Sequence, residues 1–141
     1  AASDVYKRQI EKNGLKETAN RLGKGIIAFS PLAQGLLTDR YLHGIPADSR
    51  VRTDGRFLKE SALTEEKLAQ IRALNEIAAA RGQTLAEMAL AWILKDGQVT
   101  SVLIGASRPE QILDNIKALD NTTFTAEELE AIDKASGYSK E

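Results

Sequence analysis

Apolar residues recur along the first part of this chain in two patterns, one with a helical period and one in a short unbroken run. Segment 12–23 places its apolar side chains on one face and ends in a glycine suited to a left-handed cap, so we predict a helix. The side chains are Leu15, Ala19 and Leu22, and the glycine is Gly23. Residues 25–29 are nearly all apolar and stop at a Ser-Pro pair, which predicts a strand buried on both faces of a parallel sheet.

The second half of the chain shows the same two patterns. Helices are predicted from Thr64 to Gly82 and, after a capping box at 84–87, on to about Asp96. The apolar run 99–104 predicts a second strand. Capping boxes at 107–110 and 125–128 predict two further helices, and the apolar residues expected to face inward are Ile112, Ile116 and Leu119 in the first and Leu129 and Ile132 in the second.

Between the first strand and the long helix, the periodic pattern disappears. Residues 36–62 are punctuated by Gly44, Pro46 and Gly55, so we predict a loop of a length usually associated with function or mobility. The predicted order of elements is therefore helix, strand, loop, two helices, strand and two helices.

This order defines an α/β fold that is incomplete by itself. Two parallel strands joined through helices leave edges and apolar faces that need further strands beside them. Because no repeat supplies those strands, we expect a complete α/β domain to need sequence beyond these 141 residues.

The composition of the chain excludes several classes of function but does not indicate a particular one. Lys and Arg total 19 against 20 Asp and Glu, a net charge of −1, which argues against a nucleic-acid or membrane-surface protein driven by bulk charge. The lack of cysteine excludes disulfides and thiolate metal sites. Since neither an apolar run of membrane-spanning length nor a signal peptide is recognisable, we expect a cytoplasmic protein. Oligomeric state is not predicted by the sequence.

Two candidate sites follow the two predicted strands, where α/β proteins gather ligands. After the first strand, Ser30, Pro31 and Gly35 could bring backbone amides close to an anion, or form an ordinary tight turn. After the second, residues 105–107 lie at a helix start with Arg108 and Gln111 on the rim, which is an anion pocket or a simple helix cap. Two such corners in succession match the phosphate site of many barrels.

Other polar side chains give weaker signals. Arginines of the long loop, Arg40, Arg50, Arg52 and Arg56, could clamp a pyrophosphate or simply be solvated. His43, the single histidine, lies in a turn sequence without a carboxylate at catalytic spacing, so we expect it to be exposed rather than catalytic. No metal-ligand cluster and no catalytic residue is assigned.

Two ordered motifs carry a family resemblance. Residues 25–38, GIIAFSPLAQGLLT, with Tyr41 and Arg50 beyond, resemble strand seven and its loop in aldo-keto reductases. Residues 99–115, VTSVLIGASRPEQILDN, resemble strand and helix eight of the same family, in the branch of bacterial glyceraldehyde-3-phosphate reductases and potassium-channel β-subunits. The resemblance spans about 12–134 and implies the C-terminal part of a (β/α)8 barrel.

The resemblance implies an NADP(H) site and a reaction, reduction of an aldehyde or ketone to an alcohol. It places Phe29, Ser30, Pro31, Leu32 and Gly35 at the pyrophosphate with Arg40 and Arg50, and Gly105, Ser107, Gln111, Asp114 and Asn115 at the adenosine, with Arg108 a further candidate for the 2′-phosphate. The family's catalytic Tyr, Lys, Asp and His come from earlier strands, so this chain is expected to contribute none.

The two ends of the chain depart from the family pattern. Residues 1–9, AASDVYKRQ, resemble translated adaptor sequence, so we interpret them as a non-native leader and residues 10–141 as the barrel portion. Two alternatives to a reductase portion stay open: a non-catalytic dinucleotide-binding regulatory subunit of the channel β-subunit type, and a truncated fragment without a role of its own.

Overall fold

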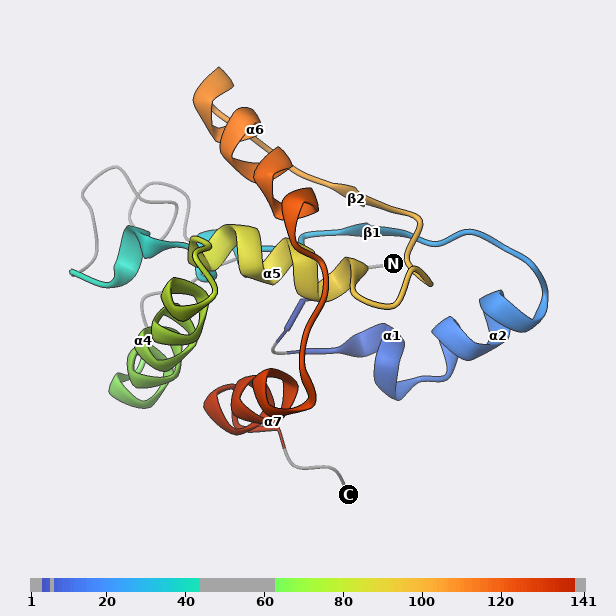
Figure 1. The fold of residues 1–141 in the computed structure, drawn as a ribbon, viewed down its shortest axis with the longest axis horizontal. Coiled ribbons are helices and arrows are strands. Elements are labelled where there is room, and N and C mark those ends of the chain that lie inside the picture. Colours follow the sequence, from blue (N-terminus) through green and yellow to red (C-terminus); the bar gives the residue numbers. More distant parts are fainter. Residues whose placement is uncertain (1–3, 6, 44–62, 139–141) are drawn as a thin grey trace.

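The computed structural model describes residues 4–5, 7–43 and 63–138. Two short parallel strands lie beside a group of helices, and α6 contacts α5 but points away from α4 and α7 (Figure 1). The elements are α1 (Gln9–Lys12), α2 (Leu15–Arg21), β1 (Ile27–Phe29), the 3-10 turns η1 (Ala33–Gly35) and η2 (Asp39–Tyr41), α4 (Glu65–Ala80), α5 (Leu85–Leu94), β2 (Ser101–Leu103), α6 (Pro109–Ile116), η4 (Lys117–Asp120) and α7 (Ala126–Ala135). This order confirms the predicted alternation, while most of the predicted loop lies outside the described residues.

Helix starts are the best-predicted local features, because their signals act within one turn. Thr64, Thr84 and Thr125 are N-caps whose hydroxyl oxygens each accept from a backbone amide three residues on. The capping boxes at Thr84 and Thr125 are complete, with Glu87 and Glu128 accepting from the cap amides. The helix predicted over 12–23 is shorter, because Gly14 at φ 72° separates α1 from α2.

The two strands pair in parallel, as predicted, with Ala28 opposite Val102. Burial on both faces was predicted, and this is wrong for the chain by itself. Ala28 is fully buried against the helices, but on the opposite face Ile27, Phe29 and Leu103 are 57%, 48% and 60% exposed. Successive side chains of a strand point to opposite faces, so one face of the sheet packs on helices and the other carries apolar groups without a cover in the described part of the chain.

The core lies between α4, α5, α7 and the buried face of the sheet. Leu74 of α4, Met88 of α5 and Ile132 of α7 are almost fully buried in one cluster. The predicted inward orientation of Ile112, Ile116 and Leu119 is wrong, since all are exposed. Ile112 and Ile116 of α6 and Leu119 of η4 form an apolar stripe that stays exposed among the described residues.

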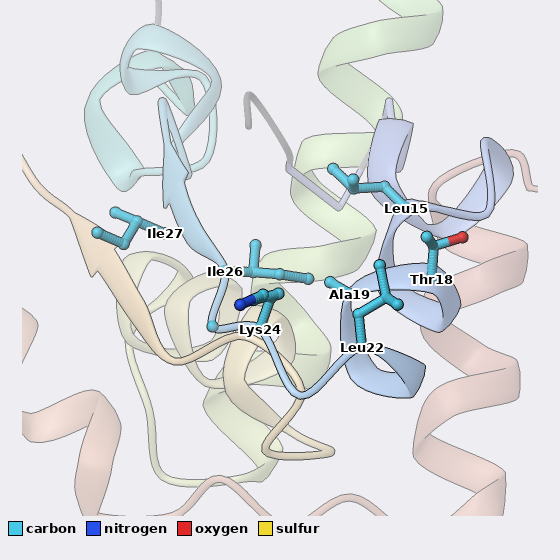
Figure 2. A pocket seen from close by; sticks show the side chains of 8 residues that line it. Leu15, Thr18, Ala19, Leu22, Lys24, Ile26 and Ile27 are labelled. Carbon is cyan, nitrogen blue, oxygen red and sulfur yellow. The ribbon is translucent and has the colours of Figure 1, made fainter.

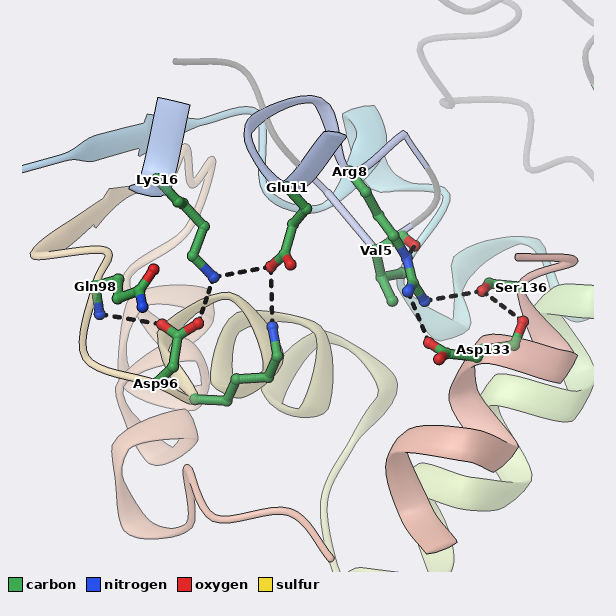
Figure 3. A network of polar contacts seen from close by, with 9 residues as sticks. Val5, Arg8, Glu11, Lys16, Asp96, Gln98, Asp133 and Ser136 are labelled. Atoms are coloured by element: carbon green, nitrogen blue, oxygen red, sulfur yellow. Dashed lines mark hydrogen bonds and ion pairs between the residues drawn. The ribbon is translucent and has the colours of Figure 1, made fainter. Parts of the chain in front are cut away.

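An arginine near the N-terminus joins the ends of the chain. Arg8 is only 5% exposed, and its guanidinium donates to Asp133 Oδ1 at 2.6 Å and Ser136 Oγ at 3.1 Å on α7 and just after it (Figure 3). It also lies over the rings of Trp92, at 4.7 Å, and Tyr138, at 4.1 Å. Asp4, Val5 and Arg8 are all buried, so these residues of the N-terminal segment pack into the fold.

Candidate cofactor site

The parallel register of the strands places both predicted corners at one edge of the sheet. Phe29 pairs with Leu103, so Ser30 and Ile104 leave neighbouring strands at the same level. Adjacent strands lie about 4.8 Å apart. The corner that starts at Ser30 (the β1 corner) and the corner at 105–107 (the β2 corner) can therefore face one ligand.

The β1 corner has an unusual backbone. Ser30, Ala33 and Gln34 adopt positive φ values of 57°, 46° and 60°, followed by Gly35 at 97°. Each non-glycine residue in this region costs on the order of 1 kcal/mol or more and persists only where the surroundings enforce it. Such clusters occur at ligand-binding turns, where they direct amide groups toward an anion.

Packing and hydrogen bonds enforce this backbone. The amides of Gly35 and Leu37 both donate to Leu32 O, at 2.9 and 3.2 Å, and Thr38 Oγ1 donates to Gly35 O at 2.7 Å. Leu37 is fully buried and Tyr41 nearly so. The shape of the β1 corner is therefore built into the folded chain.

The β2 corner is open to solvent, because residues 105–107 are all exposed. A Cβ added at Gly105 would meet nothing within 4 Å, so the packing of this chain does not require glycine there. The two amides just before α6, which an open anion pocket would leave unpaired, have a partner: Gln111 Oε1 accepts from Ser107 N at 2.8 Å and Arg108 N at 3.3 Å. The N-cap is accordingly Arg108 rather than Ser107, which corrects the predicted capping box by one residue.

The remaining adenosine-side candidates lie along α6. Asp114 and Asn115 are three and four positions after Gln111, which puts all three on one face of the helix. Asp114 Oδ1 accepts from Lys117 Nζ at 2.8 Å. The helix thus presents a continuous polar face that begins at the β2 corner.

The loop arginines are only partly described. Arg40 is an exposed residue of η2, which starts with the Thr38 hydroxyl as N-cap. Arg50, Arg52 and Arg56 lie outside the described residues. His43 is exposed, as expected of a turn residue.

Sequence reasoning missed two features of this site. The positive φ values of Ala33 and Gln34 carry no local signal, because neither residue type indicates that conformation strongly. The capping role of Gln111 had a signal, since a Gln at the third helical position commonly reaches back to the cap.

A charged network lies at the other end of β2, away from the site. Lys16 Nζ contacts both Glu11, at 2.9 Å, and Asp96, and Lys95 Nζ contacts Glu11 at 3.0 Å (Figure 3). Burial, the largest single influence, would raise the pKa of Glu11 and Asp96. Hydrogen bonds and charge interactions with Lys16 and Lys95, and at Asp96 also the Gln98 amide, together outweigh burial and leave both pKa values lowered. Burial lowers the pKa of Lys95, only partly offset by Glu11.

These shifts predict a loss of stability in acid. A carboxyl whose folded pKa is depressed stabilises the fold above its unfolded pKa, here near 3.8 to 4.5, and loses that contribution as pH falls through the folded value. Replacing both groups, Glu11→Gln with Asp96→Asn, should flatten the decrease in unfolding free energy below about pH 5. Urea titrations at several pH values measure this, with exposed Glu130→Gln as the control; an unchanged acid slope in the double variant would contradict the assignment.

Within the described ranges, no three His, Cys, Asp or Glu side chains form a group that could hold a metal ion. Among the same residues no helix combines the length and apolar character needed to cross a bilayer.

The fold is that of an α/β protein. Its two strands end at the same sheet edge, where the loops that follow the strands bind ligands in α/β barrels. The sequence profile of the aldo/keto reductase family matches residues 2–136. The chain belongs to the aldo/keto reductase family, and the match is wider than the 12–134 expected from the motifs.

Individual relatives agree with this assignment. L-glyceraldehyde 3-phosphate reductase of Escherichia coli, in strains K12 and O157:H7, is 53% identical over 134 residues, which is 93% of this chain and 39% of the relative. A voltage-gated potassium channel beta-subunit-like protein of Schizosaccharomyces pombe is 39% identical over 121 residues, 83% of this chain and 35% of the relative. The chain spans about two fifths of the length of the reductases it matches.

A solved structure supports the fold. Glycerol dehydrogenase from Gluconobacter oxydans matches 95% of this chain and 40% of its own, with a TM-score of 0.73 and 27% sequence identity. The two-stranded open sheet is thus consistent with an incomplete barrel of this family.

Proposed function

We propose that this chain is the cofactor-binding C-terminal portion of an NADPH-dependent reductase that converts an aldehyde or ketone to an alcohol in the cytoplasm. The observation that carries the proposal is the in-register parallel pairing of β1 and β2, which places the Ser30 and Gly105 corners at one sheet edge. The 53% identity to a protein named as a glyceraldehyde-phosphate reductase supports a small carbonyl substrate.

The geometry of the two corners fits a dinucleotide. The left-handed backbone at the β1 corner suits the pyrophosphate, and the buried Pro31 with its neighbours Phe29 and Leu32 would lie beside it. The open space above Gly105 allows a ligand to approach the backbone of the β2 corner. Ser107, Gln111 and the polar face of α6 would hold the adenosine, and bound NADP(H) would supply the hydride.

Gln111 has a second role in this proposal. Its side-chain oxygen already satisfies the amides of Ser107 and Arg108, so an anion at this corner must either displace that oxygen or bind beside it. Arg40 and Arg108 are exposed, and we propose that they contact the phosphates together with Arg50. A titration of the longer protein with NADPH and with NADH tests the preference; equal affinities would remove the 2′-phosphate contact from the proposal.

Catalytic proton donation is assigned to sequence outside this chain. The purified 141-residue chain should therefore show no oxidation of NADPH, followed at 340 nm, with glyceraldehyde or methylglyoxal as substrate. The longer protein that contains it, measured in parallel, is the positive control. Turnover by the isolated chain above the enzyme-free rate would overturn this assignment.

A regulatory subunit is the second candidate function, favoured by the 39% identity to the channel beta-subunit-like protein. The higher identity to reductases argues for the enzyme. The coding sequence upstream of this chain separates the two, because an intact Tyr, Lys, Asp and His set is needed for turnover and its substitution indicates a regulator. A fragment without independent function would instead melt without cooperativity when expressed alone.

A further inference from the structure

Arg81, the C-cap of α4, carries a buried charge that the proposed reaction does not use. Its side chain is 2% exposed and donates to Glu128 Oε2 at 2.5 Å. The same guanidinium donates to the carbonyl oxygen of Thr123 at 2.9 Å and to that of Asn121 at 3.4 Å. A buried ion pair often stabilises a fold no more than apolar residues would, but in some proteins it fixes a single geometry. Here it fixes segment 121–125, which runs between η4 and α7 (Figure 1).

This segment carries an aromatic ring that lies against the guanidinium. Arg81 Cζ is 3.8 Å from the centroid of the Phe124 ring. The ring also packs against a small group of almost fully buried residues, named here the support cluster, which consists of Leu90 and Ala91 of α5 and Ala118 of η4. Because Arg81 contacts both the ring and the carbonyl of the preceding residue, it fixes how the ring lies on the support cluster.

The support cluster also contacts both corners of the candidate site. Leu32 and Ile104 pack against it, as Phe124 does. The carbonyl oxygen of Leu32 accepts the amides of Gly35 and Leu37, the bonds that enforce the left-handed backbone of the β1 corner. Ile104 directly precedes the β2 corner. One small cluster therefore touches the ring held by the arginine and one side chain from each corner.

The start of β1 is less well packed than its end. An apolar hollow of about 370 Å³ lies beside the start of the strand, and Leu22 of α2 lines it together with Ile26 and Ile27 (Figure 2). Close packing is what transmits a displacement from one side chain to the next. Packing near the carboxyl end of β1, where the support cluster lies, must therefore position the β1 corner.

We propose that Arg81 is a positioning residue for the cofactor site, which acts on the two corners through Phe124 and the support cluster. The inference rests on the proposed function. Loss of the guanidinium releases the ring and two backbone carbonyls together, so Leu32 and Ile104 lose a fixed neighbour. The two corners then move more freely relative to each other. A ligand that needs both corners binds more weakly, because binding has to order them.

Arg81→Met in the longer protein tests this role, since it removes the guanidinium and retains an unbranched side chain. NADPH affinity, from fluorescence titration, should fall by about fivefold or more at a temperature at which the variant is folded. Lys16→Met is the matched control. The Lys16 side chain is 8% exposed and pairs with two carboxylates, Glu11 and Asp96, but lies at the other end of β2. It should destabilise the fold and change the NADPH affinity by less than about twofold.

Hydrogen exchange followed by mass spectrometry tests the positioning role without cofactor. In the unliganded longer protein, Arg81→Met should speed exchange in peptides that span 32–37 and 104–111, whose amides are bonded within the corners. Lys16→Met should leave exchange in both peptides unchanged. A merely structural role of Arg81 would speed exchange in α7 and in segment 121–125 but not at the corners.

Two further variants keep the test decisive if Arg81→Met does not fold. Phe124→Leu retains an apolar side chain but removes the ring that lies against the guanidinium, so it should weaken NADPH binding and speed exchange at the corners. Arg81→Lys keeps a positive charge beside Glu128 but has fewer donors for the two carbonyls. Its NADPH affinity should lie between those of Arg81→Met and the unchanged protein.

Two results would overturn the proposal. One is an NADPH affinity in Arg81→Met and Phe124→Leu equal to that of the unchanged protein. The other is exchange at the corners as slow in these variants as in Lys16→Met. Failure of the unchanged longer protein to bind NADPH would instead reject the proposed function, and the exchange measurement would still decide whether Arg81 positions the corners.

Discussion

Arg8→Ala should lower the unfolding free energy of this chain by about 3–5 kcal/mol, the usual cost of removing one partner of a buried ion pair. The Arg8 side chain is 5% exposed and that of Asp133 17%, so the carboxylate would lose its guanidinium partner with little water to replace it. The variant also loses the hydrogen bonds to Val5 O and Ser136 Oγ and the stacking on Trp92. Urea denaturation followed by tryptophan fluorescence measures the change.

Lys7→Ala is the matched control, since Lys7 is the exposed neighbour of Arg8 and the same charge is removed. It should change stability by less than about 0.5 kcal/mol. Equal effects of the two variants would mean that Arg8 does not hold the N-terminal segment onto α7. That outcome would also favour the interpretation of residues 1–9 as a non-native leader.

Gly105→Val should weaken NADPH binding to the longer protein at least tenfold, about 1.4 kcal/mol, without a comparable loss of stability. A Cβ at this position meets nothing within 4 Å in the chain, so the added methyl groups would occupy the space proposed for the ligand. Fluorescence titration with NADPH gives the affinity, and thermal unfolding without cofactor gives the stability.

Two comparison variants sharpen this experiment. Gly105→Ala should have a smaller effect in the same direction, because one carbon fills less of the approach. Lys134→Val, on the exposed surface of α7, should leave NADPH affinity unchanged. Unaltered binding in Gly105→Val would remove the β2 corner from the proposed cofactor site.

Local signals in the sequence determined the elements and their order. Two kinds of signal depend only on atoms within one helical turn. One is a threonine cap with Glu three residues later, found at Thr84 and Thr125, and the other is a glycine at the helix end, found at Gly23 with φ 62°. Both strands and both corners were also predicted, since an apolar run ended by Ser-Pro or by glycine is equally local. The family resemblance rested on the same residues.

Only the tertiary structure decided features that join distant residues or depend on what is packed nearby. The contact between Arg8 and Asp133 spans 125 positions and has no periodic signal. The left-handed Ala33 and Gln34 are held by burial of Leu37 and Tyr41, which residue preference does not encode. An apolar run shows that Ile27 and Phe29 favour burial, but not that both side chains are exposed in the described part of the chain. Whether a side chain is buried depends on the residues packed around it, and the tertiary structure determines which residues those are.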